Sequence, residues 1–174
     1  RNVHVVARDS AKQLGFKKPV AIHHHLLQGL LKLDLTQAVD KEEIKIALKM
    51  SKSKPDSAVF IHDAPDEIRR KVNSAYAPEG VIELNPILDW VKYLIFYNPT
   101  TFTVERDEKW GGDLEYSSYE ELEKDYAEKK LHPQDLKIAV SEWLIEKLEP
   151  ARKYFEDPKR KDALDEIEGL TSPK

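Results

Sequence analysis

The 174-residue sequence contains no cysteine, one methionine and only six glycines. Without cysteine there are no disulfides, no thiolate metal sites and no cysteine nucleophile, which fits a reducing cytoplasm. No apolar run approaches the roughly 20 residues that a membrane-spanning helix needs, and no signal-peptide pattern opens the chain. We therefore expect a cytoplasmic, globular protein that has no membrane partner.

The sequence also lacks a strong excess of either charge. It has 28 basic and 32 acidic residues, which give a formal net charge of −4. Bulk charge therefore does not indicate nucleic-acid binding, and any RNA contact must use local basic clusters. Candidate clusters lie at 41–54, 69–71, and 152–153 together with 159–161, and for each of them taken singly a solvated helix face is the favoured alternative.

Residues 49–53 read Lys-Met-Ser-Lys-Ser and are followed by Lys-Pro. Two ammonium groups three positions apart, separated by small hydroxyl residues, suit a loop that folds over a polyphosphate. Such a loop favours nucleotidyl or phosphoryl transfer, where charge grows on the departing phosphates. An exposed lysine–serine turn without function is the alternative.

The first third of the chain indicates a mainly α fold with an α/β portion. Residues 1–15 predict a helix that ends at Gly15, and 19–22 predict a short buried strand leading into a polar loop at 23–29. Residues 41–48 look helical, and 58–61 predict a second short strand. In open α/β sheets, ligands bind at the carboxyl ends of such strands.

From Asp63 onward the pattern becomes helical. Asp63 with Pro65 predicts the cap and first turn of a helix that runs to 76, and Asn85 with Pro86 begins another. Residues 101–104 alternate like a strand, and two glycines at 111–112 force a turn. Ser118 predicts the cap of a helix through 130, the longest helix follows from 132, and the last spans 158–169.

Several segments together resemble the tyrosyl-tRNA synthetases of the archaeal and eukaryotic type, which are class I aminoacyl-tRNA synthetases. Residues 49–53 match the KMSKS motif of that class letter for letter, but this motif alone leaves tryptophan open. Four further segments of this chain resemble motifs that are typical of the tyrosyl family, in the same order. They are Asn-Pro-Ile-Leu at 85–88, Glu-Lys-Trp-Gly-Gly-Asp-Leu at 108–114, Ser-Tyr-Glu-Glu-Leu at 118–122 and Leu-His-Pro-Gln-Asp-Leu-Lys at 131–137.

The resemblance implies a domain organisation. Residues 1–62 would be the C-terminal part of a Rossmann-type catalytic domain, and 63–174 an α-helical anticodon-binding domain. The chain opens on Arg1 without a cap and has no His-x-Gly-His motif, which in this family holds ATP from the other side. We therefore expect the later part of a longer protein, inactive alone, whose complete form is a homodimer.

The resemblance also implies a reaction, in which tyrosine is activated with ATP and then transferred to tRNA(Tyr). Magnesium would share the stabilisation of the leaving pyrophosphate. The catalytic residues of the loop would be Lys49, Ser51, Lys52 and Ser53. The residues lining the ATP site would be Leu26, Leu27 and Met50.

A second set of residues would read the tRNA. In the resembling family, positions that match Trp110, His132 and Asp135 recognise the first anticodon base by stacking and hydrogen bonding. The alternative is that Trp110 is a core aromatic beside a tight turn and that Asp135 merely caps a helix. Arg1 would approach the acceptor end of the tRNA.

Three consecutive histidines at 23–25 suggest a metal site, but neighbours on a strand point to opposite faces and cannot converge on one ion. We therefore predict no metal site in the protein itself. Two other functions stay open. One is a non-catalytic RNA-binding module, and the other is a tryptophan-specific relative, which should not carry the segments around Trp110 and His132.

Overall fold

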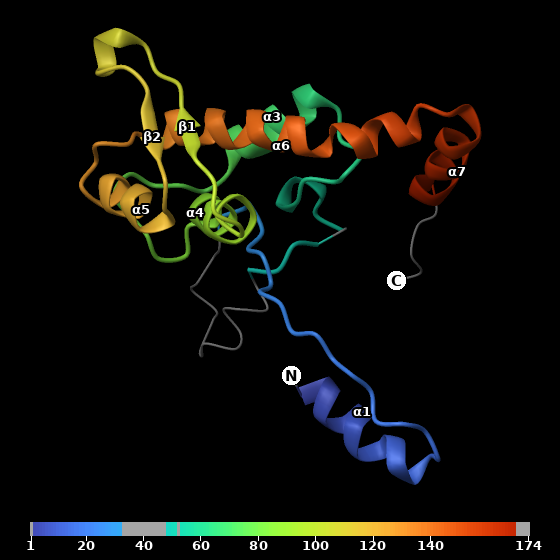
Figure 1. Ribbon diagram of the computed structural model, residues 1–174. Helices are drawn as coiled ribbons and strands as arrows, with labels where there is room; N and C mark the ends of the chain where they lie inside the picture. Colours follow the sequence, from blue (N-terminus) through green and yellow to red (C-terminus); the bar gives the residue numbers. More distant parts are fainter. Residues whose placement is uncertain (1, 33–47, 52, 170–174) are drawn as a thin grey trace.

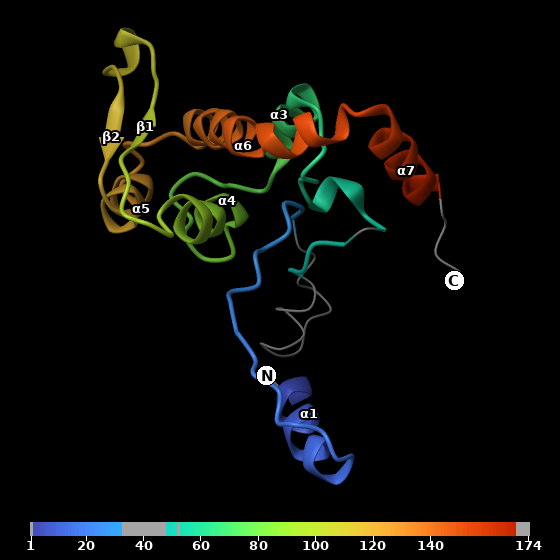
Figure 2. The same ribbon diagram turned by 45° about the vertical axis from the view of Figure 1, so that its right-hand side comes forward.

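The computed structural model describes residues 2–32, 48–51 and 53–169. Helix α1 (Asn2–Gln13) confirms the predicted first helix and stands apart from the rest of the molecule (Figures 1 and 2). An extended segment leads from it to the helical body. Several apolar side chains of this N-terminal part are exposed, among them Val3, Phe16, Val20 and Ile22.

The two strands predicted at 19–22 and 58–61 are wrong. Both segments are irregular, and Val20 is 95% exposed rather than buried. A strand needs a neighbour that accepts and donates its backbone hydrogen bonds. Within the described residues neither segment has one, so the expected α/β portion does not form a regular sheet there. The helix expected at 41–48 lies almost entirely outside the described residues.

The remaining chain is mainly helical. Its elements are η2 (Pro55–Ser57), α3 (Pro65–Ser74), α4 (Pro86–Trp90), the π-helical turn η3 (Val91–Ile95), β1 (Phe102–Val104), η4 (Glu108–Trp110), β2 (Leu114–Tyr116), α5 (Tyr119–Ala127), α6 (Pro133–Phe155) and α7 (Pro158–Gly169). None of the helices that the structure describes has the length and apolar character needed to cross a bilayer.

Local capping signals place most helix starts correctly. Asn85 caps α4 by accepting from the backbone N–H groups of Ile87 and Leu88, at 3.1 and 3.3 Å. Ser118 caps α5 through the N–H of Glu121, as predicted. Helix α5 ends at Ala127, three residues before the expected end, and α7 has the predicted bounds.

Asp63 does not cap α3, contrary to the prediction. The N-cap is Ala64, and Pro65 occupies the first turn. The Asp63 carboxylate instead accepts from the N–H of Phe60 at 2.8 Å and from the ammonium of Lys71 at 2.6 Å. Lys71 is buried, and an unpaired buried ammonium is costly, so this carboxylate is drawn to the charge rather than to the helix end.

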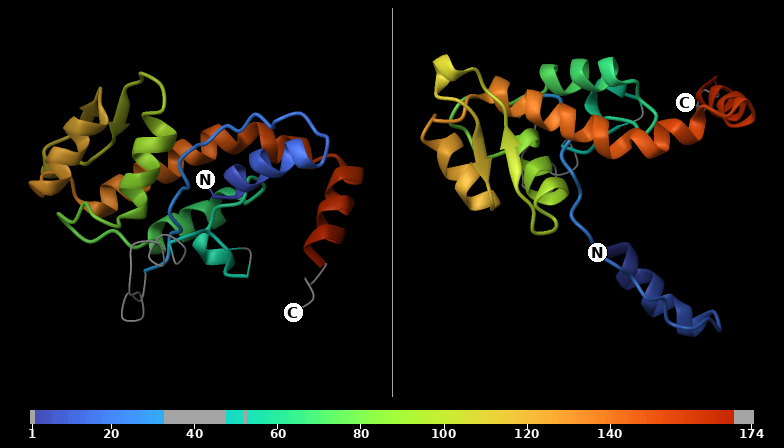
Figure 3. Two further views of the ribbon diagram at one scale, coloured as in Figure 1. Left: turned by 90° about the horizontal axis from the view of Figure 1, so that it is seen from below. Right: turned by 45° about the horizontal axis from the view of Figure 1, so that its top comes forward.

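The core lies between α3, α4 and α6, and helix α3 packs along α6 (Figure 3). Ile68 and Val72 of α3 face the stripe of α6 that includes Leu136 and Val140, and all four are almost fully buried. Tyr126 of α5 closes one end, donating its hydroxyl to the carbonyl of Pro78 at 2.9 Å.

A hairpin projects from the end of the molecule where α6 begins (Figure 1). Strands β1 and β2 are antiparallel, with Phe102 opposite Tyr116 and Val104 opposite Leu114. The predicted strand at 101–104 is confirmed, whereas its partner β2 was not predicted. Gly111 and Gly112 both have positive φ and make the turn, as their sequence indicates.

Replacing Asn85 by alanine should destabilise the fold. The buried Asn85 side chain caps α4 and donates to the carbonyl of Val81 and to the hydroxyl of Tyr126. Loss of the cap and these bonds should lower the free energy of unfolding by about 1–2 kcal/mol, measured by urea denaturation. Asn98→Ala, at an exposed position, should change it by less than about 0.5 kcal/mol. Equal effects would contradict this role of Asn85.

Candidate functional site

The lysine–serine loop, here the described residues 48–51 and 53–57, runs beside the segment 27–29. Gln28 and Lys49 form an antiparallel bridge, and the N–H of Gly29 donates to the carbonyl of Leu48 at 2.6 Å. Lys49 is exposed, whereas Met50 is half-buried and packs against the core. The structure thus brings Lys49 and Met50 to the segment that was predicted to line the ATP site. Lys52 lies outside the described residues.

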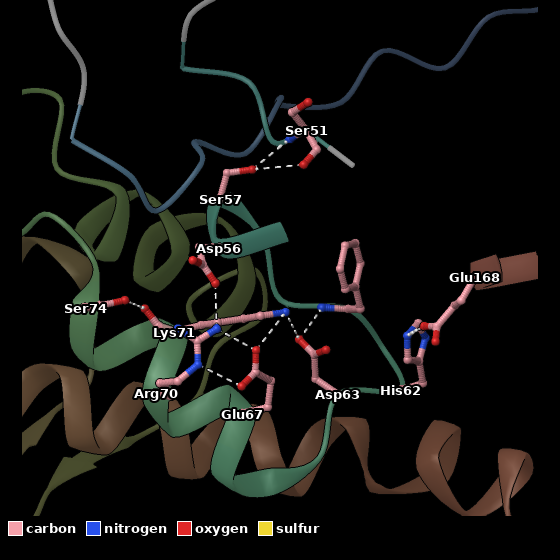
Figure 4. Close-up of polar contacts among 11 residues, drawn as sticks. Ser51, Asp56, Ser57, His62, Asp63, Glu67, Arg70, Lys71, Ser74 and Glu168 are labelled. Atoms are coloured by element: carbon pink, nitrogen blue, oxygen red, sulfur yellow. Dashed lines mark hydrogen bonds and ion pairs between the residues drawn. The ribbon is translucent and has the colours of Figure 1, made fainter. Parts of the chain in front are cut away.

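Ser57 fixes the shape of this loop. Its buried hydroxyl accepts from the N–H of Ser51 at 2.9 Å and donates to the Ser51 carbonyl at 3.2 Å (Figure 4). The N–H of Leu30 in turn donates to the Ser57 carbonyl at 2.9 Å. The hydroxyls of Ser51 and Ser53 are 2.8 Å apart. These contacts close the loop, and the sequence motif gave no sign of the part that Ser57 plays.

Gly29 lies where the two segments approach most closely. A Cβ atom at this position would stand 3.1 Å from the carbonyl oxygen of Leu48 and 3.2 Å from that of Ser57. Both neighbours are backbone atoms, so they cannot move aside as a flexible side chain would. The absence of a side chain at Gly29 is therefore what lets the loop sit against 27–29.

The segment that carries Leu26 and Leu27 is attached to α4. Asp89 is buried, and its carboxylate accepts from the N–H of Gln28 at 2.9 Å and lies 2.7 Å from Nε2 of His25. The indole of Trp90 donates to the Gln28 carbonyl at 2.7 Å. Leu27 is half-buried, whereas Leu26 is 56% exposed.

The histidine run has a structural explanation in this arrangement. His25 stacks on the ring of Tyr93, with centroids 3.7 Å apart, while its Nε2 faces Asp89. His23 contacts His4 of α1, with ring nitrogens 3.0 Å apart. Nδ1 of His24 lies 2.9 Å from the carbonyl oxygen of its neighbour His25, so the three histidines have different surroundings. In the part of the chain that the structure describes, no three His, Cys, Asp or Glu side chains are grouped to hold a metal ion.

The second predicted constellation lies at the other end of the core. Trp110 ends the short helix η4 at the hairpin tip and is 68% exposed, so the alternative that it is a core aromatic is wrong. His132 is the N-cap of α6, its Nδ1 accepting from the N–H of Gln134 at 3.1 Å. Asp135 is half-buried in the first turn, and the alternative that it caps α6 is also wrong.

Arg106, which the sequence analysis did not single out, ties these two parts together. Its Nε donates to the carbonyl of Gly112 at 2.9 Å, and its Nη1 donates to the carbonyl of Lys130 at 3.2 Å. The first contact braces the turn that carries Trp110, and the second reaches the chain two residues before His132. The N–H of Arg106 also donates to Asp113 at 2.8 Å. The hairpin tip and the start of α6 are thus held on one side of the molecule.

Arg1, predicted to approach the acceptor end of a tRNA, lies outside the described residues. The structure therefore places two groups of predicted residues. One is Lys49, Met50, Ser51 and Ser53 in the loop that runs beside the segment of Leu26 and Leu27. The other is Trp110 at the hairpin tip and His132 with Asp135 in the first turn of α6, two parts of the chain that Arg106 joins. A distinct set of contacts holds each group. Both groups are anchored on the same helical body, which is composed of α3, α4 and α6.

Comparisons with known proteins agree on one family. The family model described as "tRNA synthetases class I (W and Y)" matches residues 1–149. A tyrosine–tRNA ligase of Pyrococcus furiosus is 52% identical over 169 residues, which cover 90% of this chain and 45% of that ligase. The tyrosine–tRNA ligase of Saccharolobus solfataricus is 46% identical over 159 residues. The chain spans a little under half the length of these curated relatives.

Solved structures give the same picture. A tyrosyl-tRNA synthetase of Pyrococcus horikoshii, complexed with L-tyrosine, matches with a TM-score of 0.85 and 49% identity, covering 98% of this chain and 49% of that one. A tyrosyl-tRNA synthetase of Aeropyrum pernix matches with a TM-score of 0.75 and 44% identity, covering 98% and 46%. The arrangement of the described residues is therefore similar to half of such an enzyme.

Replacing Ser57 by alanine should loosen the lysine–serine loop without unfolding the protein. The change removes both bonds to Ser51, and a loss of about 1 kcal/mol of local stability corresponds to roughly fivefold more frequent opening. Trypsin should then cut after Lys49 about five times faster, followed by mass spectrometry. Ser117→Ala, which removes an exposed hydroxyl from the α5 cap region, should leave this rate unchanged. An unchanged rate in Ser57→Ala would refute the assignment.

Proposed function

Because the chain belongs to the class I tRNA synthetases of the tryptophan and tyrosine group, we propose that it is the C-terminal half of a tyrosine–tRNA ligase. About half of its residues are identical to those of archaeal proteins named tyrosine–tRNA ligase. It spans less than half of each, so activation of tyrosine with ATP and its transfer to tRNA(Tyr) would be activities of the complete protein.

The proposed domain boundary lies at residue 62. Residues 1–62 would complete a Rossmann-type catalytic domain, and 63–174 would form the anticodon-binding domain. Two features support this division. The segments proposed to meet ATP both precede residue 62, and the exposed apolar side chains of α1 and the extended segment suit packing against a larger domain. The core of the helices that follow is composed almost entirely of residues after 62, and Leu30 is the buried residue that the preceding part contributes to it.

In the proposed first step, the tyrosine carboxylate attacks the α-phosphate of ATP. The bond between the α-phosphate and its bridging oxygen to the β-phosphate breaks, and pyrophosphate leaves. No side chain need remove a proton, because the carboxylate is already an anion. The demand is to stabilise negative charge on the leaving group. Lys49 and Lys52 are proposed to meet it, with Ser51 and Ser53 shaping the loop around the phosphates.

The strongest support for this role is the pairing of Lys49 with Gln28. This backbone bridge brings Lys49, whose side chain is exposed, next to the segment that carries Leu26 and Leu27, where the adenosine is proposed to bind. Met50 packs against the core. Mg²⁺ is proposed to arrive on the ATP phosphates, because Mg²⁺ in such sites is held largely by phosphates and water.

The second proposed site reads the anticodon of tRNA(Tyr). Trp110 offers an exposed ring, His132 a second flat side chain, and Asp135 a carboxylate that can accept from the N–H groups of guanine. Unstacked RNA bases are recognised in this way, by stacking and by hydrogen bonds to the base edge. Arg106 would set the spacing between the two rings. Arg1 is proposed to lie near the acceptor end.

The complete protein is proposed to be a cytoplasmic homodimer, as the resemblance implies. A tyrosine rather than tryptophan substrate is supported by the segments around Trp110 and His132, which match the tyrosyl landmarks. Pyrophosphate exchange tests the proposal directly. The assay is run with tyrosine and with tryptophan, on this chain alone and on a chimera that joins it to the upstream half of the Pyrococcus furiosus ligase. Tyrosine-dependent exchange by the chimera only is the expected result.

In that chimera, replacing Lys49 or Lys52 by alanine should slow adenylate formation about a hundredfold or more. This is the scale of losing an electrostatic contact that is made mainly in the transition state. Stopped-flow or single-turnover measurement of adenylate formation gives the rate. Lys109→Ala, which removes an exposed lysine at the hairpin tip, is the matched control. A normal rate in both loop variants would refute the catalytic role of the loop.

Trp110→Ala should weaken tRNA binding while adenylate formation stays normal. Stacking is worth about 1–3 kcal/mol per base, so the affinity for an anticodon hairpin should fall about fivefold to more than a hundredfold. Fluorescence anisotropy of a labelled hairpin measures the change. Tyr97→Ala removes another highly exposed aromatic ring and should leave the affinity unaltered. Equal damage by the two variants would count against an anticodon site at Trp110.

A further inference from the structure

Two consecutive side chains of α4 hold the backbone of Gln28. The N–H of Gln28 donates to Oδ2 of Asp89 at 2.9 Å, and its carbonyl accepts from the indole N–H of Trp90 at 2.7 Å. Asp89 and Trp90 are both buried. Because both backbone groups of Gln28 are bound from α4, the helical body sets the course of the chain at this point.

The carboxylate of Asp89 also reaches His25. Nε2 of His25 lies 2.7 Å from Oδ1, while Oδ2 accepts from the N–H of Gln28. The side-chain amide of Gln28 adds a longer contact to Oδ1, at 3.4 Å. The ring of His25 is fixed from its other side by Tyr93, on which it stacks. One carboxylate therefore binds both ends of the stretch 25–28.

Between the two held ends lie Leu26 and Leu27, which are proposed to line the ATP site. Each residue of a chain has two freely rotating backbone torsions, and fixing them costs conformational entropy. A segment that became ordered only when ATP binds would lose part of its binding free energy to this cost. The contacts of Asp89 order the segment beforehand, so ATP meets a surface that is already formed.

We propose that Asp89 is a positioning residue of the ATP site, which holds Leu26 and Leu27 in the arrangement that meets the adenosine. This inference rests on the proposed function, because it needs ATP bound at this segment. The carboxylate acts through the backbone of Gln28 and the ring of His25. Asp89 lies beyond residue 62, so a side chain of the proposed anticodon-binding domain completes the nucleotide site of the catalytic domain.

The two oxygens of a carboxylate suit this position better than an amide does. Asparagine has the same shape as aspartate but only one acceptor oxygen, so its NH₂ group would face either Gln28 or His25. A histidine can change tautomer and present an unprotonated Nε2 to that NH₂ group. Asp89→Asn should therefore keep a weaker, uncharged form of the contact, whereas Asp89→Ala loses both bonds.

The test uses the chimera with the upstream half of the Pyrococcus furiosus ligase, in pyrophosphate exchange at varied ATP, tyrosine and pyrophosphate. In Asp89→Ala the KM for ATP should rise about tenfold, the scale of one charge-assisted hydrogen bond. The kcat and the KM values for tyrosine and pyrophosphate should change less than twofold, since weaker binding of the adenosine alone raises one KM. Asp89→Asn should raise the KM for ATP about threefold.

Trp90→Phe provides an independent variant of the same contact. It keeps a buried aromatic ring but removes the bond to the Gln28 carbonyl, and it should raise the KM for ATP selectively, about threefold. Val140→Ala is the control for stability, because it shortens a buried side chain between α3 and α6. It should lower the Tm and leave the KM for ATP unchanged.

The outcomes separate this role from the proposed function. If the unmodified chimera shows no tyrosine-dependent exchange, the proposed function is wrong and the role of Asp89 falls with it. If the chimera is active but the KM for ATP stays normal in the Asp89 and Trp90 variants, the positioning role alone is overturned. A parallel rise of all three KM values, or an equal rise in Val140→Ala, would likewise reduce Asp89 to a stabilising residue. Should Asp89→Ala fail to fold, Asp89→Asn and Trp90→Phe decide.

Discussion

The position of the lysine–serine loop relative to α3 depends on the buried ammonium group of Lys71. Lys71 is only 2% exposed, and its ammonium is satisfied by Asp63 at 2.6 Å and by the ring of Phe60, 4.5 Å below it. A buried charge without its partner is strongly destabilising, so the turn that supplies Asp63 has one acceptable position. The lysine–serine loop enters α3 through this turn. Asp89 anchors the segment 25–28 in a comparable way, so buried carboxylates set both proposed ATP-facing segments.

Helix starts could be predicted from the sequence where they depend only on neighbouring residues. Asparagine at 85 and serine at 118 cap helices because a short side chain reaches N–H groups two or three residues away, and no other part of the fold is needed. It failed for the strands expected at 19–22 and 58–61, since a strand depends on a neighbour that short apolar runs do not specify. The sequence predicts a cap at Asp63, because nothing near Lys71 in the sequence indicates that this lysine is buried and needs a carboxylate partner.

In the candidate site, too, some features can be predicted from the local sequence and others depend on contacts between distant residues. The loop motif and the segment around Trp110 can be recognised from the sequence alone, because the proposed chemistry restricts which residue types can occupy these positions. The contacts of Arg106 and Arg70 cannot be predicted from the sequence, because each side chain joins parts of the chain that are distant in sequence. Position, rather than residue type, gives such groups their importance. The exposure of Trp110, which decides between a core and a surface role, likewise emerged only from the fold.

Gly29 has a consequence for genetics. Even the smallest substitution, Gly29→Ala, would put a methyl group too close to the backbone carbonyls of Leu48 and Ser57. It would therefore push the segment 27–29 and the loop apart. The codon for this residue is thus a natural place to seek a temperature-sensitive allele, because even alanine there would weaken the contact between the loop and the segment 27–29.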